Sequence, residues 1–79
     1  MSIMIEAKRL LLQRYPIGSR IKLIKMDDPF SKLEKSDEGT VMFIDDMLNI
    51  HVKWDRGSSL ALLPEVDLFE AVSENSTEE

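Results

Sequence analysis

The sequence has 79 residues, 43% of them hydrophobic and 32% charged, and its formal net charge at pH 7 is −5. A chain of this length forms one small domain and buries only about 60% of its unfolded surface, which excludes a large active-site cleft. Because it contains no cysteine, a disulfide framework, a thiolate metal site and a cysteine nucleophile are also excluded. Its apolar runs are too short for a membrane span or a signal-peptide core, so we expect a cytoplasmic protein without membrane contact.

The charge is unevenly distributed along the chain. Residues 1–26 carry six basic side chains against Glu6, a net charge of +5, whereas residues 27–79 have a net charge of −10. A pI near 4.8 argues against a general duplex-DNA binder, because phosphate contacts need a cationic face. The simplest interpretation is that the basic residues solvate a helix and a strand edge. The alternative is a small nucleic-acid site formed by Lys8, Arg9, Arg14, Arg20, Lys22 and Lys25.

The first expected element is a helix over residues 2–14. Ser2 is a suitable N-cap, and Glu6 and Arg14 lie near the helix ends that favour their charges. Apolar side chains recur with helical spacing and form one stripe: Ile3, Ala7, Leu10 and Leu11. Pro16 ends the helix, because the residue before a proline avoids helical dihedrals. So short a helix is marginal alone, and we expect it to dock on the barrel or on a partner, with a homodimer through the exposed stripe as one arrangement.

Residues 15–72 alternate between apolar and polar side chains with the period of β-strands. We expect strands at 19–26, 40–44, 49–54, 58–63 and 68–72. The side chains expected on their inner faces are Ile21, Leu23, Val41, Phe43, Ile50, Val52, Trp54, Leu60 and Leu62. The alternation fails at Ile24, which indicates a β-bulge or a strand covered on both faces.

The turns between these strands define the fold class. Asp55-Arg56-Gly57 is a tight turn in which Gly57 supplies a positive φ, and residues 64–67 are expected to form one 3₁₀ turn. Five short strands in meander order predict a mainly β protein, a small SH3-like five-stranded barrel preceded by one N-terminal α-helix. An OB-fold is the alternative, but residues 55–57 leave no room for its helix. We expect the helix over 1–14, the barrel over 15–72 and a disordered acidic tail over 73–79.

Several motifs fit the pattern of one family. They are YPIGSRIKL at 15–23, MDDPF at 26–30, GTV at 39–41, IDD at 44–46 and HVKWDRGSSLAL at 51–62. In these motifs the sequence resembles the domain-of-unknown-function family 4314, small proteins of Gram-positive bacteria, phages and mobile elements. It departs from the family at residues 34–38, which lack the usual proline and glycine, and at Met47, where a turn glycine is common. The resemblance implies a small barrel and carries over no activity and no cofactor.

Two aspartate pairs, Asp27-Asp28 and Asp45-Asp46, are the candidates for a metal site. Two acidic turns brought together could supply the oxygen ligands that Mg²⁺ or Ca²⁺ needs. The spacing matches no EF-hand loop, however, and aspartate is an ordinary turn former. We therefore expect these pairs to form turns, and we expect no metal or other cofactor.

His51, the single histidine, is the candidate for catalysis. Asp45, Asp46 or Asp55 could orient its ring, and a general base also needs a nucleophile such as Ser58 or Ser59. No strained elbow motif or oxyanion hole accompanies either serine. We therefore expect His51 to pack between strands and the protein not to be an enzyme.

A shallow peptide groove framed by loops is the site that an SH3-like barrel offers to a partner. Aromatic side chains there stack on proline or cations, and nearby aspartates attract lysine or arginine. The alternative for Trp54 is that it fills the barrel, which is favoured because the chain has few aromatic residues to build a core. The alternative for Tyr15 is that it fixes the helix onto the barrel. The candidate partner-binding residues are Tyr15, Asp27, Asp28, Phe30, Trp54, Asp55 and Arg56.

The first functional hypothesis is therefore a non-catalytic adaptor that binds another protein through loop residues near Phe30 and Asp55. One alternative is nucleic-acid binding through the basic N-terminal third. Another is an acidic inhibitor of host defence machinery, in which residues 27–79 occupy a cationic channel. This last alternative follows from the mobile-element setting that the resemblance implies and from charge.

Overall fold

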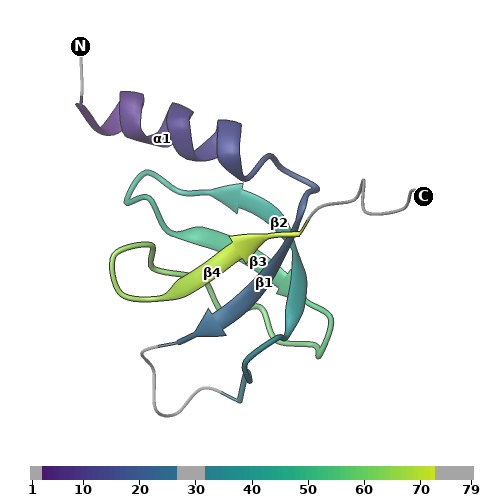
Figure 1. Ribbon diagram of the computed structural model, residues 1–79. Helices are drawn as coiled ribbons and strands as arrows, with labels where there is room; N and C mark the ends of the chain where they lie inside the picture. Colours follow the sequence, from purple (N-terminus) through teal and green to yellow (C-terminus); the bar gives the residue numbers. More distant parts are fainter. Residues whose placement is uncertain (1–2, 27–31, 73–79) are drawn as a thin grey trace.

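The computed structural model describes residues 3–26 and 32–72, which form one helix and one antiparallel β-sheet (Figure 1). The expectations for Ser2, Asp27, Asp28, Phe30 and the tail at 73–79 lie outside these residues. The elements are α1 (Ile3–Arg14), β1 (Arg20–Lys25), β2 (Glu38–Ile44), β3 (Ile50–Trp54) and β4 (Leu68–Ala71). The prediction of a mainly β protein with one N-terminal helix is confirmed. No helix in the described part of the chain is long and apolar enough to cross a membrane.

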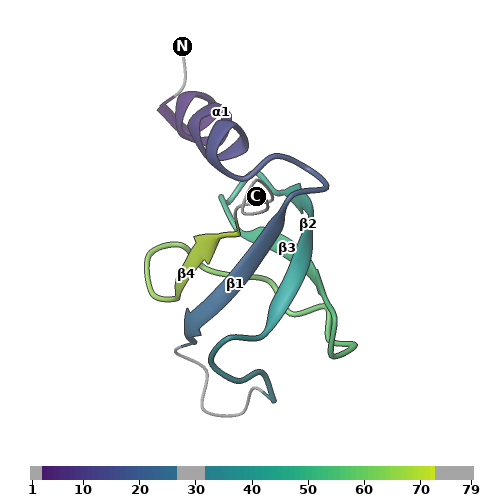
Figure 2. The ribbon, with the colours of Figure 1, turned by 45° about the vertical axis from the view of Figure 1, so that its right-hand side comes forward.

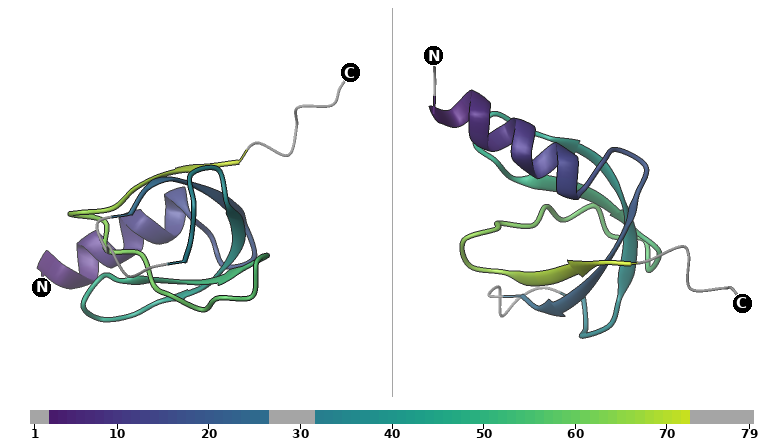
Figure 3. Two further views of the ribbon diagram at one scale, coloured as in Figure 1. Left: turned by 90° about the horizontal axis from the view of Figure 1, so that it is seen from below. Right: turned by 45° about the horizontal axis from the view of Figure 1, so that its top comes forward.

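The sheet has the strand order β3-β2-β1-β4, with every neighbouring pair antiparallel. Its strands twist and curl around the core, and α1 lies across one end (Figures 2 and 3). The bulge predicted near Ile24 is present, because the register between β1 and β4 shifts between Leu23 and Lys25. This shift lets β1 pair with two differently curved neighbours.

The prediction of a strand over 58–63 is wrong. The described residues form a four-stranded sheet, and this segment contributes one isolated bridge between Ile50 and Leu62. Ile50 and Leu62 exchange two backbone hydrogen bonds of 2.9 and 2.8 Å, and Trp54 N donates to Ser58 O at 2.9 Å. Between these points the Ser58 hydroxyl accepts a hydrogen bond from the Leu60 amide at 3.1 Å. Such a local side-chain bond competes with the ladder, so the segment follows β3 without forming a continuous strand.

The core is formed by inward-facing side chains of the strands and by two loop residues. Its buried members are Ile21, Leu23, Leu33, Val41, Ile44, Ile50, Val52, Trp54 and Leu62. The prediction that Phe43 faces inward is wrong: its side chain is 49% exposed. The register of β2 against β3 shifts between Val41 and Phe43, which turns Phe43 outward and Ile44 inward. Leu60, also predicted inward, is exposed.

Helix α1 presents a different side to the sheet from the predicted stripe. None of its residues is buried, and Leu11, Leu12 and the following Tyr15 are the ones that pack against the core. Ile3 and Leu10, two members of the stripe, are 86% and 51% exposed. The helix is therefore rotated so that only one edge of its apolar surface is covered by its own chain.

Candidate functional site

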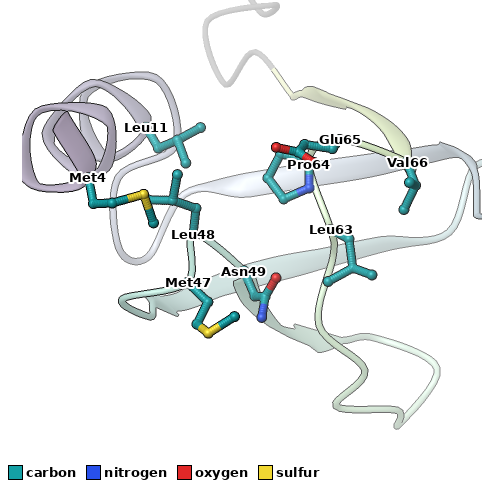
Figure 4. Close-up of a pocket in the computed structure, with 9 residues that line it drawn as sticks. All are labelled: Met4, Leu11, Met47, Leu48, Asn49, Leu63, Pro64, Glu65 and Val66. Atoms are coloured by element: carbon teal, nitrogen blue, oxygen red, sulfur yellow. The ribbon is translucent and has the colours of Figure 1, made fainter.

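An open apolar groove with a volume of about 320 Å³ lies between α1 and two turns (Figure 4). Met4, Leu11 and Leu48 gather on one side, and Leu63, Pro64 and Val66 lie on the other. We call it the α1 groove and define it by its lining residues, Met4, Leu11, Met47, Leu48, Asn49, Leu63, Pro64, Glu65 and Val66. The lining is mostly apolar and partly solvent-exposed, which is typical of a surface that binds a partner.

The first wall of the groove is shaped by the turn between β2 and β3. The Asp45 carboxylate accepts hydrogen bonds from the backbone amides of Met47 and Asn49, both at 2.9 Å, and lies 2.8 Å from His51 Nε2. The hydrogen bond with His51 and then that from the Asn49 amide lower the pKa of Asp45 from 3.8 to about 2. These bonds fix a turn in which Leu48 has a φ of 69° and the Met47 side chain is 76% exposed.

Helix α1 is joined to this turn by an ion pair. Lys8 Nζ lies 2.9 Å from Asp46 Oδ1, and the Asp46 side chain is otherwise almost fully exposed. Exposed pairs of this kind contribute little to stability. The pair lies beside the groove wall formed by Met4, Leu11 and Leu48.

The second wall is the turn at residues 63–67, which contains residues 64–67, where a 3₁₀ turn was expected. The amides of Val66 and Asp67 both donate to Leu63 O, at 3.0 and 2.8 Å. The buried Asp67 carboxylate accepts in return from the Leu63 amide at 2.8 Å. This reciprocal bonding closes the turn, so Leu63 and Val66 face solvent beside the groove although their backbone is held firmly.

The predicted partner-binding residues that the structure describes do not line the α1 groove. Trp54 is 1% exposed and its Nε1 donates to Leu60 O at 2.8 Å, so it occupies the core, as the alternative interpretation expected. The Tyr15 ring lies 5.1 Å from that of Phe69, measured between centroids, which fits its alternative role at the base of the helix. Neither ring is arranged as an open stacking platform.

Asp55 and Arg56, the other predicted contacts, are held in ion pairs on the outer surface. Arg20 donates to Asp55 at 2.9 Å and to Thr40 at 3.0 Å, and the hydrogen bond with Asp55 lowers the pKa of Asp55 and raises that of Arg20. Arg56 donates to Asp37 at 2.8 and 2.9 Å, which lowers the pKa of Asp37 and raises that of Arg56. The two arginines therefore tie the turn at 55–57 to β1 and to the loop before β2.

The basic residues of the N-terminal third are largely neutralised by their own chain. Besides the pairs of Lys8 and Arg20, Lys22 Nζ lies 3.7 Å from Glu70, and Arg9 pairs with Glu6. The Arg14 guanidinium lies 5.8 Å from the centroid of the Tyr15 ring. Lys25 ends β1 and is exposed. This pairing reduces the charge that phosphates would meet.

The His51 ring packs across two neighbouring strands. Its ring stacks on that of Phe43, with centroids 4.1 Å apart and planes 10° apart, across the β2–β3 pair. Ser58 and Ser59 share an open hollow with it, but no hydrogen bond joins either serine to the ring among the described residues. Over residues 3–26 and 32–72 no group of three or more His, Asp or Glu side chains could hold a metal ion.

The α1 groove was missed at the sequence level because its lining comes from three separate segments. One signal was available: Met47 stands at a turn position where the resembled family commonly has glycine. A large apolar side chain in a hairpin turn has no place in the core. Together with Leu63, Pro64 and Val66 in another turn, it could have indicated an apolar surface.

Comparison with known families places the chain. The family described as Domain of unknown function (DUF4314) matches residues 5–72. The chain therefore belongs to this family, and the match covers α1 from its third residue, all four strands and both turns of the α1 groove. No curated protein and no solved structure matches the chain.

Proposed function

We propose that this protein is a non-catalytic binding module that holds another protein in the α1 groove. The observation that carries the proposal is the groove itself, an apolar hollow whose walls are fixed by hydrogen bonds while its apolar side chains remain exposed. The cost of leaving Met47, Leu63 and Val66 in water is recovered when a partner covers them. The preferred occupant is a short apolar segment of another protein.

The proposal moves the adaptor surface from the loops near Asp55 to the α1 groove, between α1 and the turns at 45–49 and 63–67. Asp55 is already paired with Arg20 and Arg56 with Asp37, so a partner that used these charges would have to break both ion pairs. In the α1 groove the one ionisable lining group is Glu65. Binding there needs little rearrangement of charge, which favours the groove as the contact.

We infer further that the architecture is a reduced SH3-like barrel. Residues 58–62 run beside β3 at the position of the missing strand, through the hydrogen bonds of Ile50 and Trp54. The curled sheet and its two register shifts support the same interpretation. The absence of catalysis is part of the proposal and is supported by His51, whose ring is engaged by Phe43 and Asp45.

The test is affinity capture from host lysate, with and without nuclease, comparing wild type with Val66→Glu. Val66 is 50% exposed in the groove wall, so a glutamate there adds charge to the groove without disturbing the core. Leu68→Glu is the matched control, because Leu68 is exposed two residues further on and does not line the groove. We expect one stoichiometric protein to be retained by wild type and by Leu68→Glu after nuclease, and lost with Val66→Glu.

Two results would contradict the proposal. If Val66→Glu captures the same protein as wild type, the contact is elsewhere. If capture disappears with nuclease in every variant, nucleic acid carries the association, and the basic N-terminal third becomes the site to test. Circular dichroism of each variant establishes that all three share the same fold.

A further inference from the structure

Helix α1 carries a second apolar surface, separate from the α1 groove. Ile3, Ala7 and Leu10 follow the spacing i, i+4, i+7 and share one side of the helix, which we call the α1 stripe. Met4 and Leu11 lie on the neighbouring side and line the groove. Ile3 and Leu10 are 86% and 51% exposed, so their own chain leaves them largely uncovered.

The energetics of α1 call for a further contact. A helix of 12 residues is marginal in water without tertiary packing, and no residue of α1 is buried by the rest of the chain. Among the strands, α1 makes its main contact with β2, and Lys8 pairs with Asp46 in the turn that follows β2. A surface that buried Ile3 and Leu10 would supply the missing stabilisation.

The charges beside the α1 stripe select the occupant. Glu6 lies in the first turns of the helix and Arg14 in its last turn. In an antiparallel pair of such helices, Glu6 of each helix lies within one turn of Arg14 of the other. The two helix dipoles then point in opposite directions, which is favourable for helices that lie side by side. In a parallel pair, like charges would lie side by side. The stripe is thus complementary to itself in one orientation.

We propose that two copies of this chain associate through α1, with the helices antiparallel about a twofold axis that passes between Ala7 and Leu10. The small Ala7 of each helix then faces the large Leu10 of the other, which lets the helices approach closely. The aliphatic stem of Arg14 covers Ile3 of the second copy. The α1 groove lies on a neighbouring side of the helix and stays open, so the dimer presents two grooves.

The first test is the mass in solution by sedimentation equilibrium over a wide concentration range. We expect an average mass that rises towards twice 9.1 kDa for wild type. Leu10→Glu should weaken association at least tenfold, because it places two extra negative charges in the centre of the interface. Gln13→Glu is the matched control, with the same charge change on an exposed helix position outside the stripe, and should associate as wild type does.

The second test reads the orientation of the helices directly. Because the chain contains no cysteine, single-cysteine variants cross-link only at the introduced position. Under mild oxidation Ala7→Cys should form a disulfide-linked dimer, since the two copies of residue 7 flank the axis. Ile3→Cys and Gln13→Cys should not, because the two copies of each residue lie at opposite ends of an antiparallel pair.

The outcomes separate this inference from the proposed function. A single-chain mass up to the millimolar range, or a dimer that Leu10→Glu leaves intact, overturns the inference. Cross-linking of Ile3→Cys as efficient as that of Ala7→Cys overturns the antiparallel arrangement. None of these results bears on the α1 groove, which Val66→Glu tests separately, so either proposal can fail alone.

Discussion

At the scale of single residues, Asp45 shows how one carboxylate fixes a turn that lines the α1 groove. It accepts hydrogen bonds from the amides of Met47 and Asn49 and pairs with His51. These bonds favour the ionised form, so the pKa of Asp45 is about 2 in the folded protein against 3.8 ordinarily. Such a group stabilises the fold above its unfolded pKa, and this contribution is lost as the pH falls through the folded value.

Replacing Asp45 with Asn should therefore alter the pH dependence of stability. At neutral pH wild type should be more stable than Asp45→Asn, and the difference should shrink below pH 3.8 and vanish below about pH 2. Urea denaturation at a series of pH values measures this difference. Asp46→Asn is the control, because Asp46 is highly exposed and bonded to Lys8. A constant difference between wild type and Asp45→Asn across the acid range would contradict the assignment.

Gly39 gives a second residue-scale prediction, based on space. A Cβ there would lie 2.5 Å from Val52 Cγ1, 2.8 Å from Lys53 O and 3.0 Å from Trp54 Cα. Two of these three atoms belong to the backbone of β3 and cannot move without disrupting the sheet. Gly39→Ala should therefore destabilise the protein by about 2 kcal/mol or more.

The control for Gly39→Ala is Gly57→Ala. Nothing lies within 4 Å of a Cβ at Gly57, but its φ is 113°, a backbone conformation that side chains disfavour. Its cost should be about 1 kcal/mol, from backbone strain alone. Thermal or urea unfolding ranks the two variants, and an equal or larger loss for Gly57→Ala would contradict the steric argument.

At the scale of elements, the sequence predicted those strands in which alternation and pairing agree. β1 and β3 show the expected inward side chains, because every second residue is apolar and no register shift interrupts those positions. Phe43 and Leu60 were misplaced because a register shift in β2 and the Ser58–Leu60 hydrogen bond change which side chains face inward. Both depend on pairing between segments, which single-strand periodicity does not contain.

The rotation of α1 has a similar origin. Leu11 and Leu12 face the core while Ile3 and Leu10 face solvent, although all four fit a helical apolar pattern. The apolar residues of α1 span more of its circumference than one docking surface can cover. Periodicity therefore predicted the helix, whereas the side that packs against the core depends on tertiary contacts that periodicity does not contain.

The turn at 63–67 carries the element-scale prediction. Asp67 is buried, and its carboxylate accepts the Leu63 amide at 2.8 Å. Asp67→Ala leaves the Leu63 amide without its acceptor and should cost about 1 kcal/mol. It should also loosen the second wall of the α1 groove. Under native conditions the Leu63 amide hydrogen should therefore exchange faster in Asp67→Ala than in wild type. Glu65→Ala, an exposed change in the same turn, is the control.

At the scale of the whole molecule, the sequence indicated the type of candidate site, a binding surface, but not its location. A small chain without a plausible reaction centre indicated a binding protein, and that hypothesis stands as a proposal. The location could not be predicted, because Met4, Met47 and Val66 lie in three segments that only the folded chain brings together. Of the predicted residues, Trp54 is buried in the core, and the Asp55 carboxylate is paired with Arg20 of the same chain.

Because the core of this domain is small, self-association through α1 should raise its free energy of unfolding. Its buried side chains come from the sheet and two loop segments, and none comes from α1. If the α1 stripe is covered by a second copy, folding and association are linked, and the unfolding midpoint must depend on protein concentration. A tenfold rise in concentration above the dissociation constant should stabilise the dimer by about 1.4 kcal/mol. Urea unfolding at several concentrations measures this shift. Gln13→Glu should reproduce it and Leu10→Glu should abolish it, whereas a midpoint independent of concentration in wild type would show that α1 is stabilised within a single chain.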